Sequence, residues 1–264
     1  MIKDDAETLM LKIIEDKISM ADTLKKRSRY DSLIYIKNII DENNIDGDVV
    51  EIGVWKGGIA IYLASIFDNK RFWSIDSYEG FQKEADTVFK INNGYIYNDG
   101  ILADKHFAEN IKLNKKCSVQ LELVKSNFRR YGFKIDDETS RIKFLKGYVK
   151  DTLYNNPNCP IEKIAVLRID VDAYSAYLEI LYSLYDKVVN GGIIILDDYP
   201  MLHIQKAIDD FSKERKIHIN LRLPTTYEYF NLKEVNQKAL YDKNHELLRG
   251  VWWIKGVDDM EYSF

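Results

Sequence analysis

From residue 48 onward, short runs of β-forming residues alternate with longer runs of helical periodicity, and this alternation is the strongest constraint on the fold. Buried strands are predicted at 49–53, 71–75, 141–145, 164–169 and 193–196. Helical patterns lie among them at 59–67, 121–131, 175–189 and 203–215. Strands joined through helices pair in parallel, because a parallel crossover needs about a dozen residues or more. The sequence therefore predicts an α/β fold built on a parallel sheet.

The remaining segments are predicted to surround this sheet. Helical periodicity at 6–21 and 30–43 favours an N-terminal helical segment, 1–46, that caps a site or contacts another subunit. The basic run between these helices, 25–29, is either a solvated linker or a gate for an anionic substrate. The main domain, 47–264, is expected to contain an irregular insertion at about 81–114 that covers a site as a lid. Two closing strands are predicted at 217–223 and 250–255, with a polar connection between them.

Composition excludes several classes of protein. The chain has 264 residues, which fits one large domain, and its net charge of −4 argues against a general nucleic-acid binder. No run approaches the roughly 18 apolar residues that a membrane span needs. The two cysteines, Cys117 and Cys159, favour a reducing cytoplasm over a disulfide-stapled secreted protein. The four histidines are too scattered for a classical zinc site.

A glycine-bearing turn follows the first strand of the domain. Glu51 and Gly53 end the strand, Trp55 lies in the turn, and Gly57 and Gly58 open the next helix. Glycine lets the backbone approach a ligand closely, and a helix N-terminus favours a carboxylate or phosphate. An acid before the first glycine suits a ligand that carries an ammonium group.

A second acid lies where the ribose of the same ligand would bind. Asp76 ends the second strand, where an acid typically binds the hydroxyl groups of a ribose. The spacing E-x-G-x-x-x-G differs from the G-x-G-x-x-G of dinucleotide sites. These features predict an S-adenosylmethionine site, with the amino-acid end of the cofactor at the glycine turn and its ribose at Asp76.

Carboxylates also end two later strands. Asp170 and Asp172 follow the fourth strand, and Asp197 and Asp198 follow the fifth. Four acids at neighbouring strand ends repel one another unless a cation lies between them, whereas capping of the following helices needs only one aspartate each. An all-oxygen set suits Mg²⁺, with Mn²⁺ or Ca²⁺ as alternatives. We predict Asp170, Asp197 and Asp198 as metal ligands and Asp172 as a general base that takes the proton of an acceptor hydroxyl.

Seven motifs in a fixed order resemble the macrocin O-methyltransferase family, which are metal-dependent class I methyltransferases of sugar hydroxyls in natural products. They are GDVVEIGVWKGG (47–58), SIDSYEG (74–80), NFRRYG (127–132), FLKGYVKDTL (144–153), LRIDVDAY (167–174), GGIIILDDY (191–199) and AIDDF (207–211). The segment GVWWIK (250–255) resembles the last strand of the family. The resemblance implies a Rossmann-like, doubly wound and mostly parallel sheet whose last strand is antiparallel.

The resemblance also assigns site residues. It implies the same metal ligands and base as the argument from charge, and it adds Ser77, Gly147 and Tyr148 to the cofactor pocket with Glu51, Gly53 and Asp76. The expected partner is a small glycoside or saccharide acceptor, and a homo-oligomer is a further expectation. Three departures concern the acceptor side: Val171 replaces a small residue, and the segments 81–114 and 224–248 differ from the family pattern.

Three functions are therefore open at this stage. The first is O-methylation of a sugar hydroxyl of a glycosylated natural product or saccharide. The second is the same chemistry on a catechol or another phenol, whose adjacent oxygens would chelate the metal. The third is a methyltransferase-like binding module without turnover, which the intact acidic pairs disfavour.

Overall fold

A six-stranded sheet forms the centre of the protein. The computed structural model describes residues 3–18, 27–81, 88–91, 94–97, 102–103, 117–154, 156–224 and 249–261. The strands of the central sheet, in spatial order, are β10 (Val251–Ile254), β8 (Val188–Leu196), β7 (Ile164–Ile169), β1 (Asp48–Ile52), β2 (Phe72–Asp76) and β6 (Ile142–Lys146). All neighbouring pairs are parallel except β10 with β8, which is antiparallel. The predicted α/β class, with an antiparallel last strand, is confirmed.

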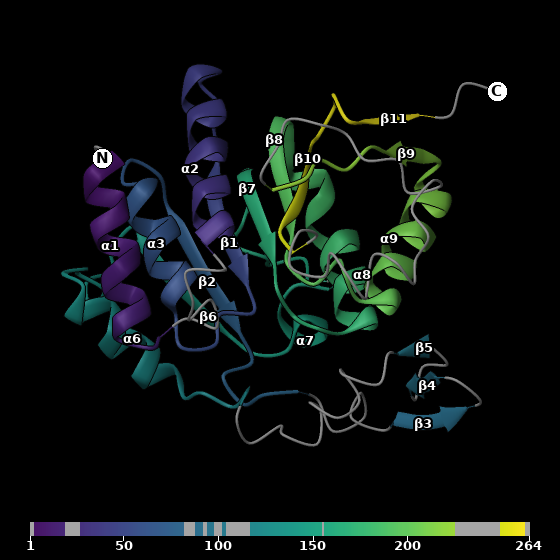
Figure 1. Cartoon of the computed structure of the whole chain (residues 1–264), viewed down its shortest axis with the longest axis horizontal. Helices are drawn as coiled ribbons and strands as arrows, with labels where there is room; N and C mark the ends of the chain where they lie inside the picture. Colours follow the sequence, from purple (N-terminus) through teal and green to yellow (C-terminus); the bar gives the residue numbers. More distant parts are fainter. Residues whose placement is uncertain are drawn as a thin grey trace.

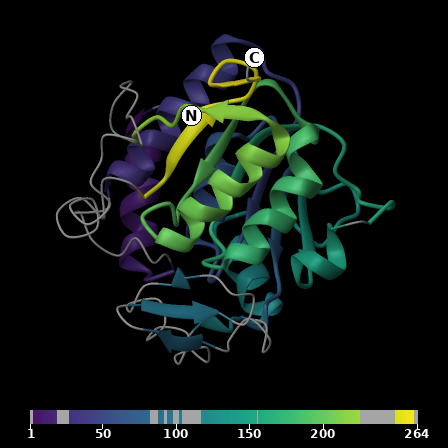
Figure 2. The same ribbon diagram turned by 90° about the vertical axis from the view of Figure 1, so that its right-hand side faces the viewer.

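Helices cover both faces of this sheet (Figures 1 and 2). One face packs against α1 (Lys3–Glu15), α2 (Arg27–Glu42), α3 (Gly58–Ile66) and α6 (Leu121–Arg130). The other packs against α7 (Val149–Thr152), α8 (Tyr174–Leu184) and α9 (Leu202–Arg215). Alternate residues of β1 serve the two layers, since Val49 belongs to the first core and Val50 to the second. Side chains buried on both faces explain the apolar runs IAVL (164–167) of β7 and IIIL (193–196) of β8.

The order of the strands creates a switch point between β1 and β7. The chain runs from β1 outward through β2 to β6, and then crosses back to place β7 on the other side of β1. Ligands of open α/β sheets bind at the carboxyl ends of the strands at such a point. The glycine turn after β1 and the aspartates after β7 therefore lie side by side.

Two predicted elements differ from the structure. The helix predicted at 175–189 ends at Leu184, and a short 3₁₀ turn, η2 (Tyr185–Lys187), leads into β8. Gly191 and Gly192 lie inside β8, which begins at Val188. The β-branched Val188 and Val189 favour the strand, and Val188 pairs with Ile164 of β7 before a shift in register.

Two small sheets lie outside the central one. The strand predicted at 217–223 is shorter, β9 (Ile217–Ile219), and pairs with β11 (Asp259–Glu261) instead of joining the central sheet. The segment predicted as irregular contains β3 (Val88–Ile91), β4 (Gly94–Tyr97) and β5 (Leu102–Ala103), which pair antiparallel with one another. The rest of that insertion, and the polar connection 225–248, lie outside the described residues.

The N-terminal helices share the core of the main domain. Ala6, Met10 and Ile13 of α1 and Tyr30 and Ile36 of α2 are almost fully buried in the same cluster as α3. The division at residue 46 stays a prediction.

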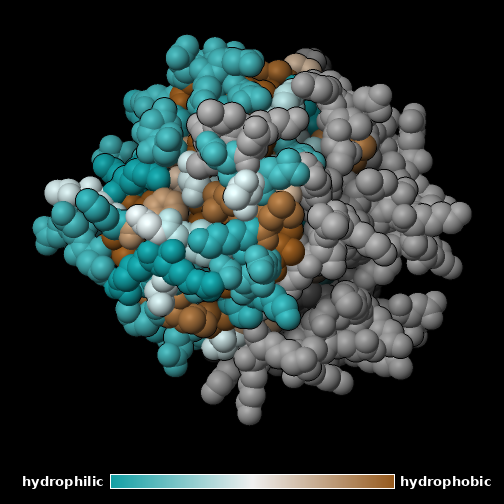
Figure 3. Space-filling model, turned by 60° about the vertical axis from the view of Figure 1, so that its left-hand side comes forward, coloured by the Kyte–Doolittle hydropathy of each residue, from teal (hydrophilic) through white to brown (hydrophobic). Residues whose placement is uncertain are grey.

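The surface is predominantly hydrophilic on the face that carries α1. Figure 3 shows hydrophobic residues there as separate patches among hydrophilic ones. No helix in the described part of the chain combines the length and apolar character required to cross a membrane. Cys117 and Cys159 are both free thiols.

Candidate active site

A cavity opens at the carboxyl ends of β1, β2, β6 and β7. It is lined by the predicted cofactor residues Glu51, Gly53, Trp55, Gly58, Asp76, Ser77, Gly147 and Tyr148, and by Asp170 and Asp172. The fold thus brings together residues from four strand ends that are spread over more than a hundred positions of sequence. Of the predicted cofactor residues, Gly57 alone does not line the cavity.

Gly53 lies directly against the backbone of Asp170, just after β7. Its φ is 85°, and a Cβ atom there would lie 1.7 Å from the carbonyl oxygen of Asp170. The adjoining strand ends remain paired, because the amide of Asp170 donates to the carbonyl of Ile52 at 2.9 Å. A bare backbone is therefore required at this position by the protein itself, in addition to any ligand.

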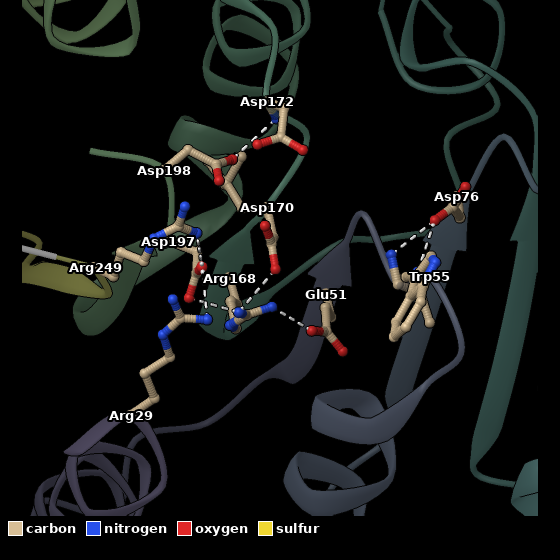
Figure 4. A network of polar contacts seen from close by, with 12 residues as sticks. Arg29, Glu51, Trp55, Asp76, Arg168, Asp170, Asp172, Asp197, Asp198 and Arg249 are labelled. Atoms are coloured by element: carbon tan, nitrogen blue, oxygen red, sulfur yellow. Dashed lines mark hydrogen bonds and ion pairs between the residues drawn. The ribbon is translucent and has the colours of Figure 1, made fainter. Parts of the chain in front are cut away.

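Asp76 holds the turn after β1 in place through hydrogen bonds to backbone amides. Its Oδ2 accepts hydrogen bonds from the amides of Val54 (2.7 Å) and Trp55 (3.1 Å), and its Oδ1 accepts one from the amide of Tyr78 (2.7 Å). Figure 4 shows the carboxylate facing the turn that carries Trp55. A carboxylate has about four acceptor positions. Asp76 can therefore hold the loops after β1 and β2 together and still receive a hydroxyl donor from the cavity.

The two glycines at the start of α3 contact other parts of the chain. The amide of Gly58 donates to the carbonyl of Ile18, just after α1, at 3.0 Å. A Cβ atom on Gly57 would lie 3.1 Å from Val124 of α6. Gly58 lines the cavity and Gly57 does not, and the assignment of both glycines to the cofactor stays a prediction.

The residues after β6 form the opposite wall. The amide of Gly147 donates to the carbonyl of Asp76 at 3.0 Å, and the hydroxyl of Tyr148 lies 3.5 Å from the carbonyl of Phe81. Ser77 donates from its Oγ to the carbonyl of Gly80 at 2.7 Å. These contacts place Ser77, Gly147 and Tyr148 together, as the family resemblance implies, with Tyr148 as an aromatic wall of the cavity.

Three of the four predicted aspartates converge. Carboxylate oxygens of Asp170, Asp172 and Asp198 lie within 4.8 Å of one another, which is a spacing that can hold a metal ion. Asp198 is fully buried, and its Oδ2 accepts the amide hydrogen of Asp172 at 2.9 Å (Figure 4). Its Oδ1 is buried without a hydrogen-bond partner. A cation would satisfy that oxygen, so the donor set fits Mg²⁺.

Asp197 faces arginines instead. Its Oδ1 accepts a hydrogen bond from Arg168 Nη2 at 2.7 Å, and its Oδ2 lies 3.4 Å from Arg29 Nη1 and 3.5 Å from Arg249 Nη1 (Figure 4). Arg168 also contacts Glu51 (2.5 Å) and Asp170 (2.9 Å). The predicted assignment of Asp197 as a metal ligand stays a prediction, since these contacts neither include nor exclude a cation.

The arginines are the site residues that the sequence analysis did not identify. Arg29 belongs to the predicted basic run, but it lies in α2 and is only 7% exposed, so it is not part of a solvated linker. Lys25 and Lys26 of that run lie outside the described residues. Arg168 had a visible signal, because it is the one charged residue of the apolar run IAVLRI. Arg249 had no such signal, because it follows the polar connection, where a charged residue is expected.

Burial and mutual repulsion govern the ionisation of these acids. Burial raises the pKa of Glu51 and of Asp170 to about 8, and that of Asp172 to about 6. Burial and the neighbouring Asp172 and Asp197 also raise the pKa of Asp198. Burial opposes ionisation of Asp197 as well, but the surrounding arginines hold its pKa well below the ordinary range. The site is therefore short of positive charge everywhere except at Asp197.

The cofactor pocket, like the acidic cluster, contains a buried carboxylate oxygen without a hydrogen-bond partner. Glu51 is 1% exposed, and its Oε2 is buried without a hydrogen-bond partner, although Oε1 contacts Arg168. An ammonium group in the cavity would supply the missing donor. The residues present thus fit S-adenosylmethionine.

Comparison with known proteins gives consistent matches. The family model described as Macrocin-O-methyltransferase (TylF) matches residues 5–223. A Streptomyces olivaceus protein, 8-demethyl-8-(2,3-dimethoxy-alpha-L-rhamnosyl)-tetracenomycin-C 4'-O-methyltransferase, is 32% identical over 73% of this chain and 68% of its own length. Mycinamicin III 3''-O-methyltransferase from Micromonospora griseorubida is 30% identical over 75% of this chain and 72% of its own. The structure of the O-methyltransferase NovP aligns with a TM-score of 0.60 and 26% identity, covering 87% of this chain and 79% of that one.

Proposed function

The chain belongs to the macrocin O-methyltransferase family, and from that premise we propose that it methylates a sugar hydroxyl of a glycosylated natural product or saccharide. Its relatives are O-methyltransferases, and the chain is an S-adenosylmethionine-dependent O-methyltransferase. The name of the Streptomyces olivaceus relative includes a rhamnosyl group, and this supports a sugar acceptor over a catechol or phenol. The observation that carries the proposal is the single cavity in which the glycine turn after β1 meets the aspartates after β7.

The residues of the site divide into two groups in this proposal, and of these Asp197 and Asp198 are buried and do not line the cavity. Glu51, Gly53, Asp76 and the wall after β6 bind S-adenosylmethionine, with Glu51 Oε2 available to an ammonium group. Asp170, Asp197 and Asp198 hold a divalent cation, which is Mg²⁺ or else Mn²⁺ or Ca²⁺. When bound, the cofactor would supply the methyl group, and a divalent cation would orient the acceptor hydroxyl and lower its pKa.

Asp172 acts as the general base. It lines the cavity beside Asp170, so an acceptor hydroxyl in the cavity can reach its carboxylate. The hydroxyl oxygen forms the new bond to the methyl carbon, the carbon–sulfur bond breaks with its electron pair on sulfur, and the hydroxyl proton passes to Asp172. The products are the methyl ether, S-adenosylhomocysteine and a protonated carboxyl group.

An acceptor screen tests the substrate class. The purified protein, S-adenosylmethionine and Mg²⁺ are incubated with deoxysugar glycosides, polysaccharide fragments and catechols, and release of S-adenosylhomocysteine is measured. Turnover of glycosides or saccharides alone is the expected result. Turnover confined to catechols would overturn the sugar assignment while leaving methyl transfer intact.

Two further measurements test the metal and the base. EDTA should abolish turnover and Mg²⁺ should restore it, so full activity in the chelator would reject the metal role. Asp172→Asn should retain binding of S-adenosylhomocysteine and lose about 10²–10⁴-fold in kcat, which is the usual contribution of general acid–base catalysis. Asp209→Asn, a change in an exposed acid of α9 that pairs with Lys213, is the matched control.

A further inference from the structure

Asp172 has a left-handed backbone conformation, which aspartate adopts more readily than most residues with a side chain but less readily than glycine. Its φ is 55°, in the left-handed region. For a residue with a side chain this conformation costs roughly 1–2 kcal/mol, and it persists only where the surroundings hold it. A glycine would avoid this cost, so retention of an acid here requires other groups to keep the loop between β7 and α8 in place.

Both peptide groups of Asp172 are held by one neighbouring segment. The amide donates to Asp198 Oδ2 at 2.9 Å, and the carbonyl oxygen lies 3.0 Å from His203 Nε2. A carbonyl can only accept, so Nε2 carries the proton of this hydrogen bond. Asp198 lies in the turn after β8 and His203 lies in the first turn of α9, so the segment from β8 to α9 contacts both the amide and the carbonyl of Asp172.

His203 is suited to fixing a position rather than to binding a ligand. Its side chain is completely buried, and it does not line the cavity, whereas Asp172 does. The imidazole is anchored on a fourteen-residue helix whose Ile204, Ala207 and Phe211 are buried in the core. It therefore restrains the carbonyl of Asp172 from the protein side of the loop.

We propose that His203 is a positioning residue that keeps the carboxylate of Asp172 in place for proton transfer, an inference that rests on the proposed function. Without the hydrogen bond from Nε2, the left-handed peptide relaxes and the carboxylate moves. A displacement of about 1 Å in a reacting group can cost 10²-fold in rate. The effect falls on kcat, because His203 touches neither the cofactor residues nor the interior of the cavity.

Three substitutions test this role. His203→Phe keeps a ring and removes the donor, and His203→Gln keeps an N–H donor at a similar reach. His218→Phe, in an exposed histidine of β9, is the matched control. For each we would measure kcat, KM for the acceptor, Kd for S-adenosylhomocysteine by calorimetry, and Tm.

The expected pattern separates positioning from general stability. His203→Phe should lower kcat by about 10–100-fold with KM and Kd within twofold, and His203→Gln should recover most of kcat. A wild-type kcat in His203→Phe, or a loss in His203→Gln as large as in His203→Phe, would overturn the proposal. If the Phe variant does not fold, His203→Met takes its place, because methionine matches glutamine in length and lacks the donor.

A double-mutant cycle separates this proposal from the assignment of Asp172 itself. Adding His203→Phe to Asp172→Asn should lower kcat no further, because His203 acts through Asp172. A full additional loss would refute the coupling. Wild-type kcat in Asp172→Asn would instead reject the base, whereas an inactive Asp172→Asn beside a fully active His203→Phe would reject positioning alone.

Discussion

Replacing Gly53 with alanine tests whether the site depends on the close approach of β1 and β7. The new Cβ atom would lie 1.7 Å from the carbonyl oxygen of Asp170 and 2.5 Å from its carbonyl carbon. Both obstacles are backbone atoms, so no side chain can rotate away. The two strand ends would have to separate by more than an ångström to reach a normal contact.

The cost can be worked from the contacts that such a separation breaks. A left-handed φ costs an alanine roughly 1–2 kcal/mol relative to glycine. Separation also disrupts the hydrogen bond from the amide of Asp170 to the carbonyl of Ile52, a contribution of about 1 kcal/mol, and disturbs the packing beside it. We expect Gly53→Ala to lower the free energy of unfolding by about 3–5 kcal/mol, within the range that marks a specific structural conflict.

Gly132 provides a matched control. Its φ of 86° is almost the same as that of Gly53, but a Cβ atom added there, at the end of α6, would meet nothing within 4 Å. Gly132→Ala should therefore show the conformational cost alone, about 1–2 kcal/mol. Urea unfolding with an unchanged m value measures both differences, and calorimetry with S-adenosylhomocysteine measures binding. Equal destabilisation by the two variants would refute the argument from strand contact.

Two further predictions concern the stability of the fold. Asp16 contacts the end of α6, and hydrogen bonding to Tyr131 lowers the pKa of Asp16 below the ordinary 3.8. The contribution of Asp16 to the free energy of unfolding is therefore present above pH 3.8 and is lost as the pH falls through the lowered pKa. Urea unfolding should show Asp16→Asn to be less stable by about 1 kcal/mol at neutral pH, with a difference that shrinks in acid; a constant difference would contradict this. Asp259→Ala should cost about 2–4 kcal/mol, because the indole of Trp253 and a tyrosine hydroxyl lose a buried acceptor. Glu261→Ala, exposed on the same strand, should leave Tm nearly unchanged.

The fold was predictable to the extent that periodicity encodes it. The strand at 164–169 agrees with β7 to the residue, because its side chains are buried on both faces and all but Arg168 are apolar. The helix predicted at 175–189 extends too far, since the apolar Leu184, Tyr185 and Val188 fit a helical period, and only the pairing of Val188 with β7 selects the strand. The pairing of β9 with β11 depends on contacts across the polar connection, which local pattern does not contain.

Residues of the cavity were predictable from sequence where the residue type and its place at a strand end both point to a specific role. Gly53 and Asp76 stand at strand ends where the fold requires them, and both line the cavity. Gly57 fits the same glycine pattern but does not line the cavity, and an added Cβ there would lie 3.1 Å from Val124, a contact that the local pattern does not contain. The hydrogen bond between Ile18 and Gly58 is likewise invisible in sequence, because it joins segments forty positions apart through backbone atoms alone.

The charge of the cavity sets the last prediction. The sequence analysis predicted that a cation offsets the acids at the strand ends. In the structure, part of that positive charge comes from the three arginines that surround Asp197. Five carboxylates, those of Glu51, Asp170, Asp172, Asp197 and Asp198, face these three guanidinium groups. If all five acids were ionised, the balance would be two negative charges, which a single divalent cation would neutralise. Without a cation, burial raises the pKa of Glu51, Asp170 and Asp198 and opposes their ionisation. A metal role is therefore consistent with the arginines, but it must be tested one carboxylate at a time.

Titration with Mn²⁺, followed by electron paramagnetic resonance, can assign the ligands without relying on activity. Asp197 Oδ2 is buried and accepts no hydrogen bond, so we expect it to join Asp170 and Asp198 on the metal and Asp172 to stay off it. Asp197→Asn should then weaken Mn²⁺ binding by at least about tenfold, because even the outer partners of a metal site contribute 10–100-fold. Asp172→Asn should leave the affinity within a few fold. The opposite result would place Asp172 in the ligand set that its distance to Asp170 and Asp198 allows, and would leave Asp197 as the anchor that holds α2 and the start of β10 against the site.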